Sequence, residues 1–200
     1  MIKNSGITNM VNWEIGEIQT LNNSIIQLTP KESAELFQLS SQQRKQEYKA
    51  IRVLKQFVFG SDEIIYGKNG KPELHHEGLF IGISHSKQWA LFAHSLKAFG
   101  CDIEQPNERI HRVKDRFCSN DELELFAGEV GIIQLTQLWG CKEAIYKLIN
   151  ESGIHWKDQM RCTGISETNF TFTVETNKHF TVNCESFSLN NAIISIATYA

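Results

Sequence analysis

The sequence lacks the features that mark fibrous, disordered or membrane-spanning proteins. It has only three prolines in 200 residues, so it contains no proline-rich linker. No apolar run approaches the ~18 residues that span a membrane, and the first twenty residues lack the apolar core of a signal peptide. Hydrophobic residues make up 41% and charged residues 22%, as in ordinary globular proteins. We therefore expect a soluble, cytoplasmic protein without a membrane partner.

Cysteine is also sparse, and the pattern excludes a disulfide framework. There are five cysteines, an odd number, and none forms a C-x-x-C pair. We expect five reduced, buried thiols. His75 and His76 are adjacent, but no partner stands at zinc-ligand spacing.

Neither sign of charge dominates, which gives no support for nucleic-acid binding. The formal net charge is −3. Residues 1–98 carry 11 Lys and Arg against 9 Asp and Glu, whereas residues 99–200 carry 9 against 14. The division could suit a protein that binds both a polyanion and a metal ion, but on the charge count alone chance scatter of surface charges is the better explanation.

The first half reads as a strand, two helices and three further strands. A helix is expected after Thr29 and Pro30, and a longer one from Ser40 to Gly60, with Ser40 and Gln43 at capping-box spacing. The basic residues of the long helix form either an exposed polar face or an anion-binding face. Asn69-Gly70 predicts a turn, and strands are expected at 11–18, 79–84, 88–95 and 97–104.

The second half repeats this make-up. Helices are expected at 108–116, from Ser119 with a capping box to Glu122, and at 132–150. The closing strands are expected at 160–166, 170–175, 179–186 and 192–199. We predict an α+β fold of two pseudo-symmetric halves, 1–98 and 99–200, each a small, mainly antiparallel sheet packed with a long helix.

Two acidic residues form the first candidate site. Asp102 and Glu104 are two positions apart in a predicted strand, so both carboxylates point to one face. A hard divalent ion such as Mg²⁺ fits such a pair. A solvated strand end is the alternative.

The predicted helix 132–150 carries the second candidate. Glu143 and Lys147 lie together at i,i+4 spacing on the flank of its apolar stripe. They could face the Asp102 and Glu104 pair. Lys142 falls inside the stripe, which indicates either a snorkelling side chain or a defined polar partner.

A third candidate is the sequence G-I-S-H-S at the end of a predicted strand. Ser84 and His85 lack the G-x-S-x-G elbow of serine hydrolases. These two residues could instead bind phosphate, as could Lys71 in the preceding turn.

Four motifs occur in order along the chain. They are G-K-P at 70–72, I-S-H-S at 83–86, G-C-D-I-E at 100–104 and W-G-C-K-E-A-I-Y-K at 139–147. This set resembles the 4′-phosphopantetheinyl transferases, specifically the surfactin-synthetase-activating (Sfp) type. The four motifs on which the resemblance rests lie between Gly70 and Lys147, and residues 150–200 contain no motif of this family.

The resemblance implies a monomer that binds coenzyme A between its halves. It implies Mg²⁺-dependent transfer of 4′-phosphopantetheine from coenzyme A to a serine of an apo acyl or peptidyl carrier protein, with release of adenosine 3′,5′-bisphosphate. The stretch between Pro106 and Ile133 would contact the carrier, an acidic helical domain. Four basic side chains there suit that partner: Arg109, Arg112, Lys114 and Arg116.

The resemblance also implies roles for individual residues. Asp102, Glu104 and Glu143 would hold the metal. Glu143 is the expected general base for the carrier serine, and Lys147 the group that stabilises charge on the phosphates. The phosphates of coenzyme A would contact Arg44, Arg52, Lys71, Ser84, His85 and Lys147.

Two other functions stay open on the sequence. One is a serine hydrolase that uses Ser84 and His85. The other is a non-catalytic relative that binds coenzyme A or a carrier protein and modifies nothing.

Overall fold

A computed structural model describes residues 4–67, 69–126 and 128–200 of the chain. The chain divides into two compact units, Met1–Lys97 and Ala98–Ala200, and each is described by itself. Lys68 of the predicted turn and Ala127 of the predicted carrier-binding stretch lie outside the described residues.

Unit 1 is one antiparallel sheet with a long helix and shorter elements. The sheet has the order β1-β2-β6-β5, and every neighbouring pair is antiparallel. A two-stranded ladder, β3-β4, stands apart from it. The elements in chain order are β1 (Asn4–Thr8), β2 (Val11–Glu17), α1 (Ile18–Leu21), α2 (Pro30–Gln38), α3 (Gln42–Phe59), β3 (Ile65–Tyr66), β4 (Pro72–Glu73), β5 (Phe80–His85) and β6 (Trp89–Ser95).

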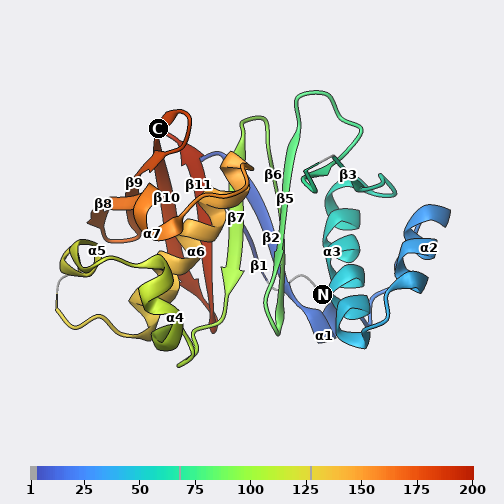
Figure 1. Cartoon of the computed structure of the whole chain (residues 1–200). Coiled ribbons are helices and arrows are strands. Elements are labelled where there is room, and N and C mark those ends of the chain that lie inside the picture. The colour runs from blue at the N-terminus through green and yellow to red at the C-terminus, as the bar shows by residue number, and fades with distance from the viewer. Residues whose placement is uncertain (1–3, 68, 127) are drawn as a thin grey trace. The chain divides into compact units, whose positions relative to one another are not determined.

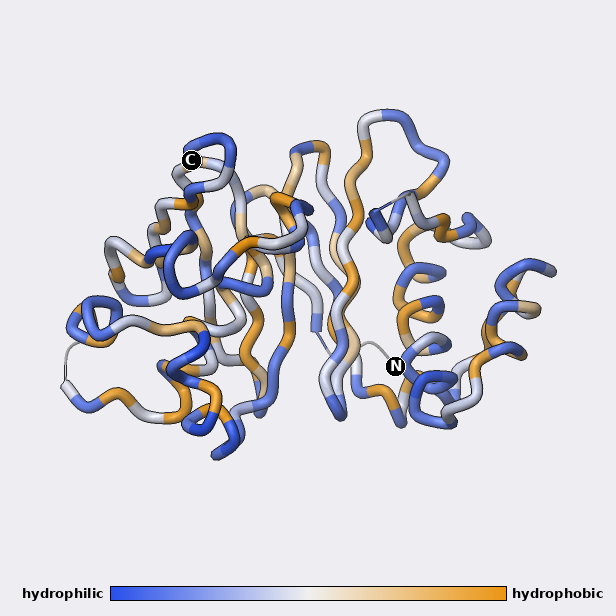
Figure 2. Tube along the Cα trace, viewed as in Figure 1, coloured by the Kyte–Doolittle hydropathy of each residue, from blue (hydrophilic) through white to orange (hydrophobic). Residues whose placement is uncertain are grey.

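The core of unit 1 forms between α3 and the sheet. Ala50, Ile51 and Leu54 of α3 are buried in one apolar cluster with Ile81 of β5 and Phe92 of β6. Figure 1 shows α3 alongside these strands, and Figure 2 shows apolar and polar residues alternating along the helix. The helical spacing of the apolar residues therefore determines which side of α3 faces the sheet.

Two predictions for α3 are wrong. The helix begins after Ser41, whose hydroxyl accepts a hydrogen bond from the Arg44 amide at 3.4 Å. The N-cap is therefore Ser41 and not Ser40, so the capping box of Ser40 with Gln43 does not form, and the Gln43 side chain donates to Glu47 at 2.8 Å. The basic residues also form no continuous exposed face, because Arg52 is only 2% exposed.

Unit 2 is a second antiparallel sheet with a long helix. The strand order is β7-β11-β10-β9-β8, again antiparallel throughout. The elements are β7 (Phe99–Glu104), α4 (Ile110–Phe117), α5 (Asn120–Glu124), α6 (Ile132–Ile149), α7 (Trp156–Gln159), β8 (Met160–Ser166), β9 (Asn169–Glu175), β10 (His179–Leu189) and β11 (Ala192–Tyr199). The predicted α+β class, with an antiparallel sheet and a long helix in each half, is confirmed.

A glycine sets the distance between α6 and its sheet. A Cβ at Gly100 of β7 would overlap the carbonyl oxygen of Ala144 and lie 2.7 Å from the amide nitrogen of Leu148. Only glycine allows the helix backbone to approach the strand this closely. Leu138, Ile145 and other residues of α6 then complete the apolar core of unit 2.

The prediction of five free, buried thiols is confirmed. All five cysteines are free and buried. Within the described ranges, no helix has both the length and the apolar composition needed to cross a bilayer.

We expect Gly100→Ala to destabilise unit 2 by about 1–3 kcal/mol, because α6 has to move away from β7 to admit the methyl group. Denaturant unfolding measures this loss. Gly164→Ala is the control, since a Cβ there meets nothing within 4 Å. Equal stability of the two variants would contradict the close approach of α6 to β7.

Candidate functional site

The acidic cluster of unit 2 is defined here as Asp102 and Glu104 of β7 with Glu143 and Lys147 of α6. The Lys147 ammonium lies 2.7 Å from Asp102 Oδ1 and also donates to the Cys101 carbonyl at 3.1 Å. Asp102 is 4% exposed, whereas the Lys147 side chain is 36% exposed, so the pair has a buried carboxylate and an ammonium that is partly open to water. The close approach of α6 at Gly100 brings the two charges into contact.

The ion pair keeps Lys147 protonated. Burial acts to lower the pKa of the Lys147 ammonium, but the Asp102 carboxylate and smaller contributions outweigh burial and raise it. Lys147 is thus a permanent cation at neutral pH, on the same flank of α6 as Glu143.

Glu104 is held by an aromatic side chain of α6. The Trp139 indole donates to Glu104 Oε1 at 2.9 Å. Burial, followed by the charge of Asp102, raises the pKa of Glu104 to about 7, while the Trp139 hydrogen bond opposes the shift. In the sequence Trp139 opens the W-G-C-K-E motif, and nothing in its spacing indicated this polar contact.

Glu143 has a carboxyl group suited to proton transfer near neutral pH. Burial raises the pKa of Glu143 to about 7, Asp102 adds to the shift, and Lys147 opposes it. A carboxylate with this pKa accepts a proton efficiently under physiological conditions.

The donor set of the cluster fits a hard divalent cation. Asp102 raises the pKa of both glutamates, so three carboxyl groups share one electrostatic environment with a single ammonium. Mg²⁺ prefers carboxylate oxygens and would neutralise this excess of negative charge. Among the described residues, however, no three His, Cys, Asp or Glu side chains are already arranged around a metal position.

Gly140 leaves room beside the cluster. A Cβ at this position would lie 2.7 Å from Ser195 Oγ and 3.8 Å from Asp102 Oδ2. Ser195 is buried and hydrogen-bonded to Ser186 at 2.9 Å. Sequence reasoning missed Gly140, although its place inside the W-G-C-K-E motif was a signal.

Arg44 and His85 meet in unit 1. The Arg44 guanidinium lies 3.2 Å from His85 Nε2 and donates to Glu47 Oε2 at 3.1 Å. The same Nε2 lies 3.6 Å from Glu47 Oε2, so the carboxylate contacts both the guanidinium and the imidazole. Glu47, 5% exposed, was not predicted, although it follows Arg44 by one helical turn.

Arg52 is held inside unit 1 by acidic residues of α2. Its guanidinium lies 3.5 Å from Glu32 and 3.8 Å from Glu35, and 3.5 Å from the centroid of the Tyr48 ring. These contacts pack α2 against α3. Arg52 nevertheless lines the same hollow as Arg44 and His85.

This hollow has a volume of about 270 Å³ and lies wholly within unit 1. It brings together three predicted phosphate ligands from α3 and β5. Its walls are Leu39, Arg44, Glu47, Tyr48, Ile51, Arg52, Tyr66, Ile83 and His85.

Two further predicted residues do not line the hollow. Ser84 is buried, 7% exposed, and pairs with Leu91 of β6. Lys71 lies 5.5 Å from the centroid of the Phe80 ring, and burial lowers the pKa of its ammonium. The strand β5 continues into a hairpin with β6 instead of the helix that follows a nucleophile elbow, and His85 contacts Arg44. This geometry does not favour a serine hydrolase.

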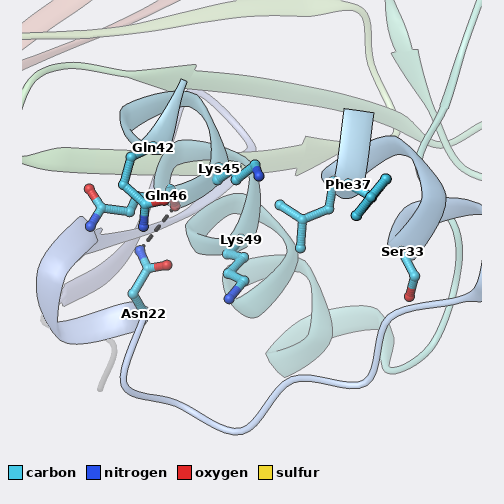
Figure 3. A pocket seen from close by; sticks show the side chains of 8 residues that line it. Asn22, Ser33, Phe37, Gln42, Lys45, Gln46 and Lys49 are labelled. Carbon is cyan, nitrogen blue, oxygen red and sulfur yellow. Dashed lines mark hydrogen bonds between the residues drawn. The ribbon is translucent and has the colours of Figure 1, made fainter. Parts of the chain in front are cut away.

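A second hollow of unit 1, about 320 Å³, contains none of the predicted residues. Figure 3 shows Lys45 and Lys49 of α3 on one side of it and Phe37 of α2 on the other. Its lysines belong to a different side of α3 from Arg44, which makes them useful controls.

The family model described as the 4′-phosphopantetheinyl transferase superfamily matches residues 98–197, half of the chain. The matched residues include the whole acidic cluster and nearly all of unit 2. Comparison with curated proteins gave no significant match.

Glu143→Gln should stabilise the protein at pH 8 by about 1–2 kcal/mol. The folded-state pKa of Glu143, about 7, lies above its ordinary value of 4.5. Protonated Glu143 therefore contributes its full stabilisation of the fold below about pH 4.5, and this contribution is lost as the pH rises through 7. Glutamine cannot ionise, so the variant avoids the free-energy cost of a charge at this position.

Urea unfolding at pH 5 and pH 8 measures the effect, and the difference between the variant and the unmodified protein should shrink at pH 5. Glu175→Gln, at an exposed position of β9, should change neither value. A Glu143→Gln protein less stable than the unmodified protein at pH 8 would contradict the buried charge.

Proposed function

The chain belongs to the 4′-phosphopantetheinyl transferase superfamily, and we propose that it is an enzyme of the Sfp type. It transfers the 4′-phosphopantetheine group of coenzyme A to a serine of an apo acyl or peptidyl carrier protein. The observation that carries this proposal is the acidic cluster, which lies entirely within the residues matched by the family. Its complete set of acids and lysine argues against a non-catalytic relative.

The reaction forms one bond and breaks one. The carrier serine Oγ bonds to the phosphorus that bears the pantetheine, and the bond from that phosphorus to the bridging oxygen of the pyrophosphate breaks. Adenosine 3′,5′-bisphosphate leaves. Such a displacement depends on positioning and charge neutralisation more than on covalent participation of the protein.

Glu143 takes the proton of the carrier serine, directly or through one water. Without a bound cation its pKa is about 7, so part of the carboxylate is ionised at neutral pH and can accept a proton. Lys147, kept protonated by Asp102 at 2.7 Å, stabilises negative charge that develops on the departing phosphate.

Asp102, Glu104 and Glu143 would hold Mg²⁺. The bound ion would neutralise and orient the phosphate oxygens of coenzyme A. The Trp139 indole fixes Glu104 Oε1, so one carboxylate of the set is oriented before any cation binds.

The coenzyme A phosphates are assigned to Arg44, Arg52, Lys71, Ser84, His85 and Lys147. The hollow in unit 1 supports the assignment of Arg44, Arg52 and His85, which line it, but not that of Lys71 and Ser84, which do not. Two units with a sheet and a long helix each suit the Sfp type, a cytoplasmic monomer by resemblance.

We expect the purified chain to modify an apo carrier protein in the presence of coenzyme A and Mg²⁺. Mass spectrometry of the carrier detects the added phosphopantetheine. Chelation of the metal should abolish transfer, and Glu143→Gln should reduce kcat by roughly 10²–10⁴-fold because it removes the base. Glu175→Gln should retain full activity. Failure to modify any member of a broad carrier panel would refute the proposed function.

Arg44→Gln should raise the KM for coenzyme A by about tenfold with little change in kcat, because it removes one charge-assisted phosphate contact. Lys45→Gln is the matched control. It removes the same charge one residue along α3, from the second hollow (Figure 3). Equal effects of the two variants would remove Arg44 from the binding site.

A further inference from the structure

Lys142 of α6 is a fully buried ammonium, 0% exposed. It directly precedes Glu143 in the chain, but it contacts other elements. The Nζ atom lies 2.7 Å from Glu122 Oε1 and donates to the carbonyl oxygens of Phe117 at 2.5 Å and Trp156 at 3.1 Å. All three N–H donors of the ammonium thus have acceptors. Of the two sequence interpretations, the defined polar partner is confirmed.

Glu122 is also buried, at 1% exposed, and both oxygens of its carboxylate accept hydrogen bonds. Its Oε2 accepts from the Ser119 amide at 2.8 Å, which completes the capping box of α5. Its Oε1 accepts from the Cys162 amide of β8 at 2.9 Å as well as pairing with Lys142. The carboxylate therefore connects the start of α5 with both α6 and β8.

Together the two side chains join five elements of unit 2. Lys142 reaches the C-terminal carbonyl of α4, the first residue of α7 and the acid of α5, while Glu122 reaches β8. An apolar pair of similar volume often stabilises a fold as well as a buried ion pair does. This ion pair differs from an apolar pair in that its hydrogen bonds are directional. Each hydrogen bond fixes the orientation of the group that it contacts.

The segment that this pair orients carries exposed arginines on α4, whereas the exposed charges of α5, Asp121 and Glu124, are acidic. The helices α4 and α5 have only 8 and 5 residues, too few to be stable alone. Phe117 anchors the end of α4 in the core. Arg109, Arg112 and Arg116 are exposed along or beside α4, and a bound acidic surface would meet them.

We propose that Lys142 and Glu122 are positioning residues that hold the segment Arg109–Glu124 so that the arginines of α4 face an acidic carrier protein. The inference rests on the proposed function for the identity of the partner. The orientation of the segment depends only on the contacts of the two side chains.

Steady-state kinetics with coenzyme A and the apo carrier test the proposal. Lys142→Met should raise the KM for the carrier by roughly tenfold or more, through loss of several directed hydrogen bonds. The KM for coenzyme A should stay within about twofold. Glu122→Gln should give the same pattern, and Lys178→Met, at an exposed position of unit 2, should change neither constant. A rise confined to the KM for coenzyme A, or a fall in kcat alone, would overturn the proposal.

A double variant separates orientation from stability. Lys142→Met with Glu122→Leu removes both buried charges and should recover much of the thermal stability lost in Lys142→Met. The amides of Ser119 and Cys162 still lack their acceptor, so the carrier KM should stay raised. Recovery of the carrier KM along with stability, or failure of all three variants to fold, would overturn the positioning role.

Hydrogen exchange provides a readout that needs no activity. In Lys142→Met the amides of α4 and α5 should exchange faster, whereas those of β7 and β11 should keep their protection. If the unmodified protein transfers nothing, the proposed function fails, while this exchange pattern still tests the orientation of the segment. Uniform loss of protection across unit 2 would overturn the proposal.

Discussion

The close approach of α6 to β7 at Gly100 is the constraint on which the rest of unit 2 depends. Because the glycine has no side chain, the helix backbone lies directly on the strand. At this distance the Lys147 ammonium reaches both Asp102 and the Cys101 carbonyl. The same geometry carries Trp139 to Glu104. The absence of a side chain at Gly100 thus allows the contacts that position three charged side chains, Lys147, Asp102 and Glu104.

The cluster that results is unfavourable for folding and useful for chemistry. Burial and mutual repulsion raise the pKa of Glu104 and Glu143 to about 7, which means that the folded chain holds two ionised glutamates near neutral pH only at a cost. The apolar core around Leu138 and Ile145 offsets that cost. Functional sites commonly carry strain of this kind.

The sequence was sufficient to predict those features that depend on local spacing. Strand alternation put Asp102 and Glu104 on one face, and helical spacing put Glu143 beside Lys147. It was insufficient where the answer depended on distant packing. Arg52 lies inside the fold because α2 covers it with acidic residues, and Lys142 meets an acid twenty positions earlier in the chain. The start of α3 was misplaced by one residue because adjacent serines offer the same local signal.

The hollow of unit 1 already contains an anionic side chain, the carboxylate of Glu47, which contacts Arg44 and His85. Glu47 already accepts a hydrogen bond from the Arg44 guanidinium, so any phosphate that binds there exchanges one anion for another. The net gain in free energy is smaller than an isolated arginine would provide. The benefit is that the guanidinium is already oriented when the ligand arrives, and that a carboxylate is ready to replace the ligand when it leaves.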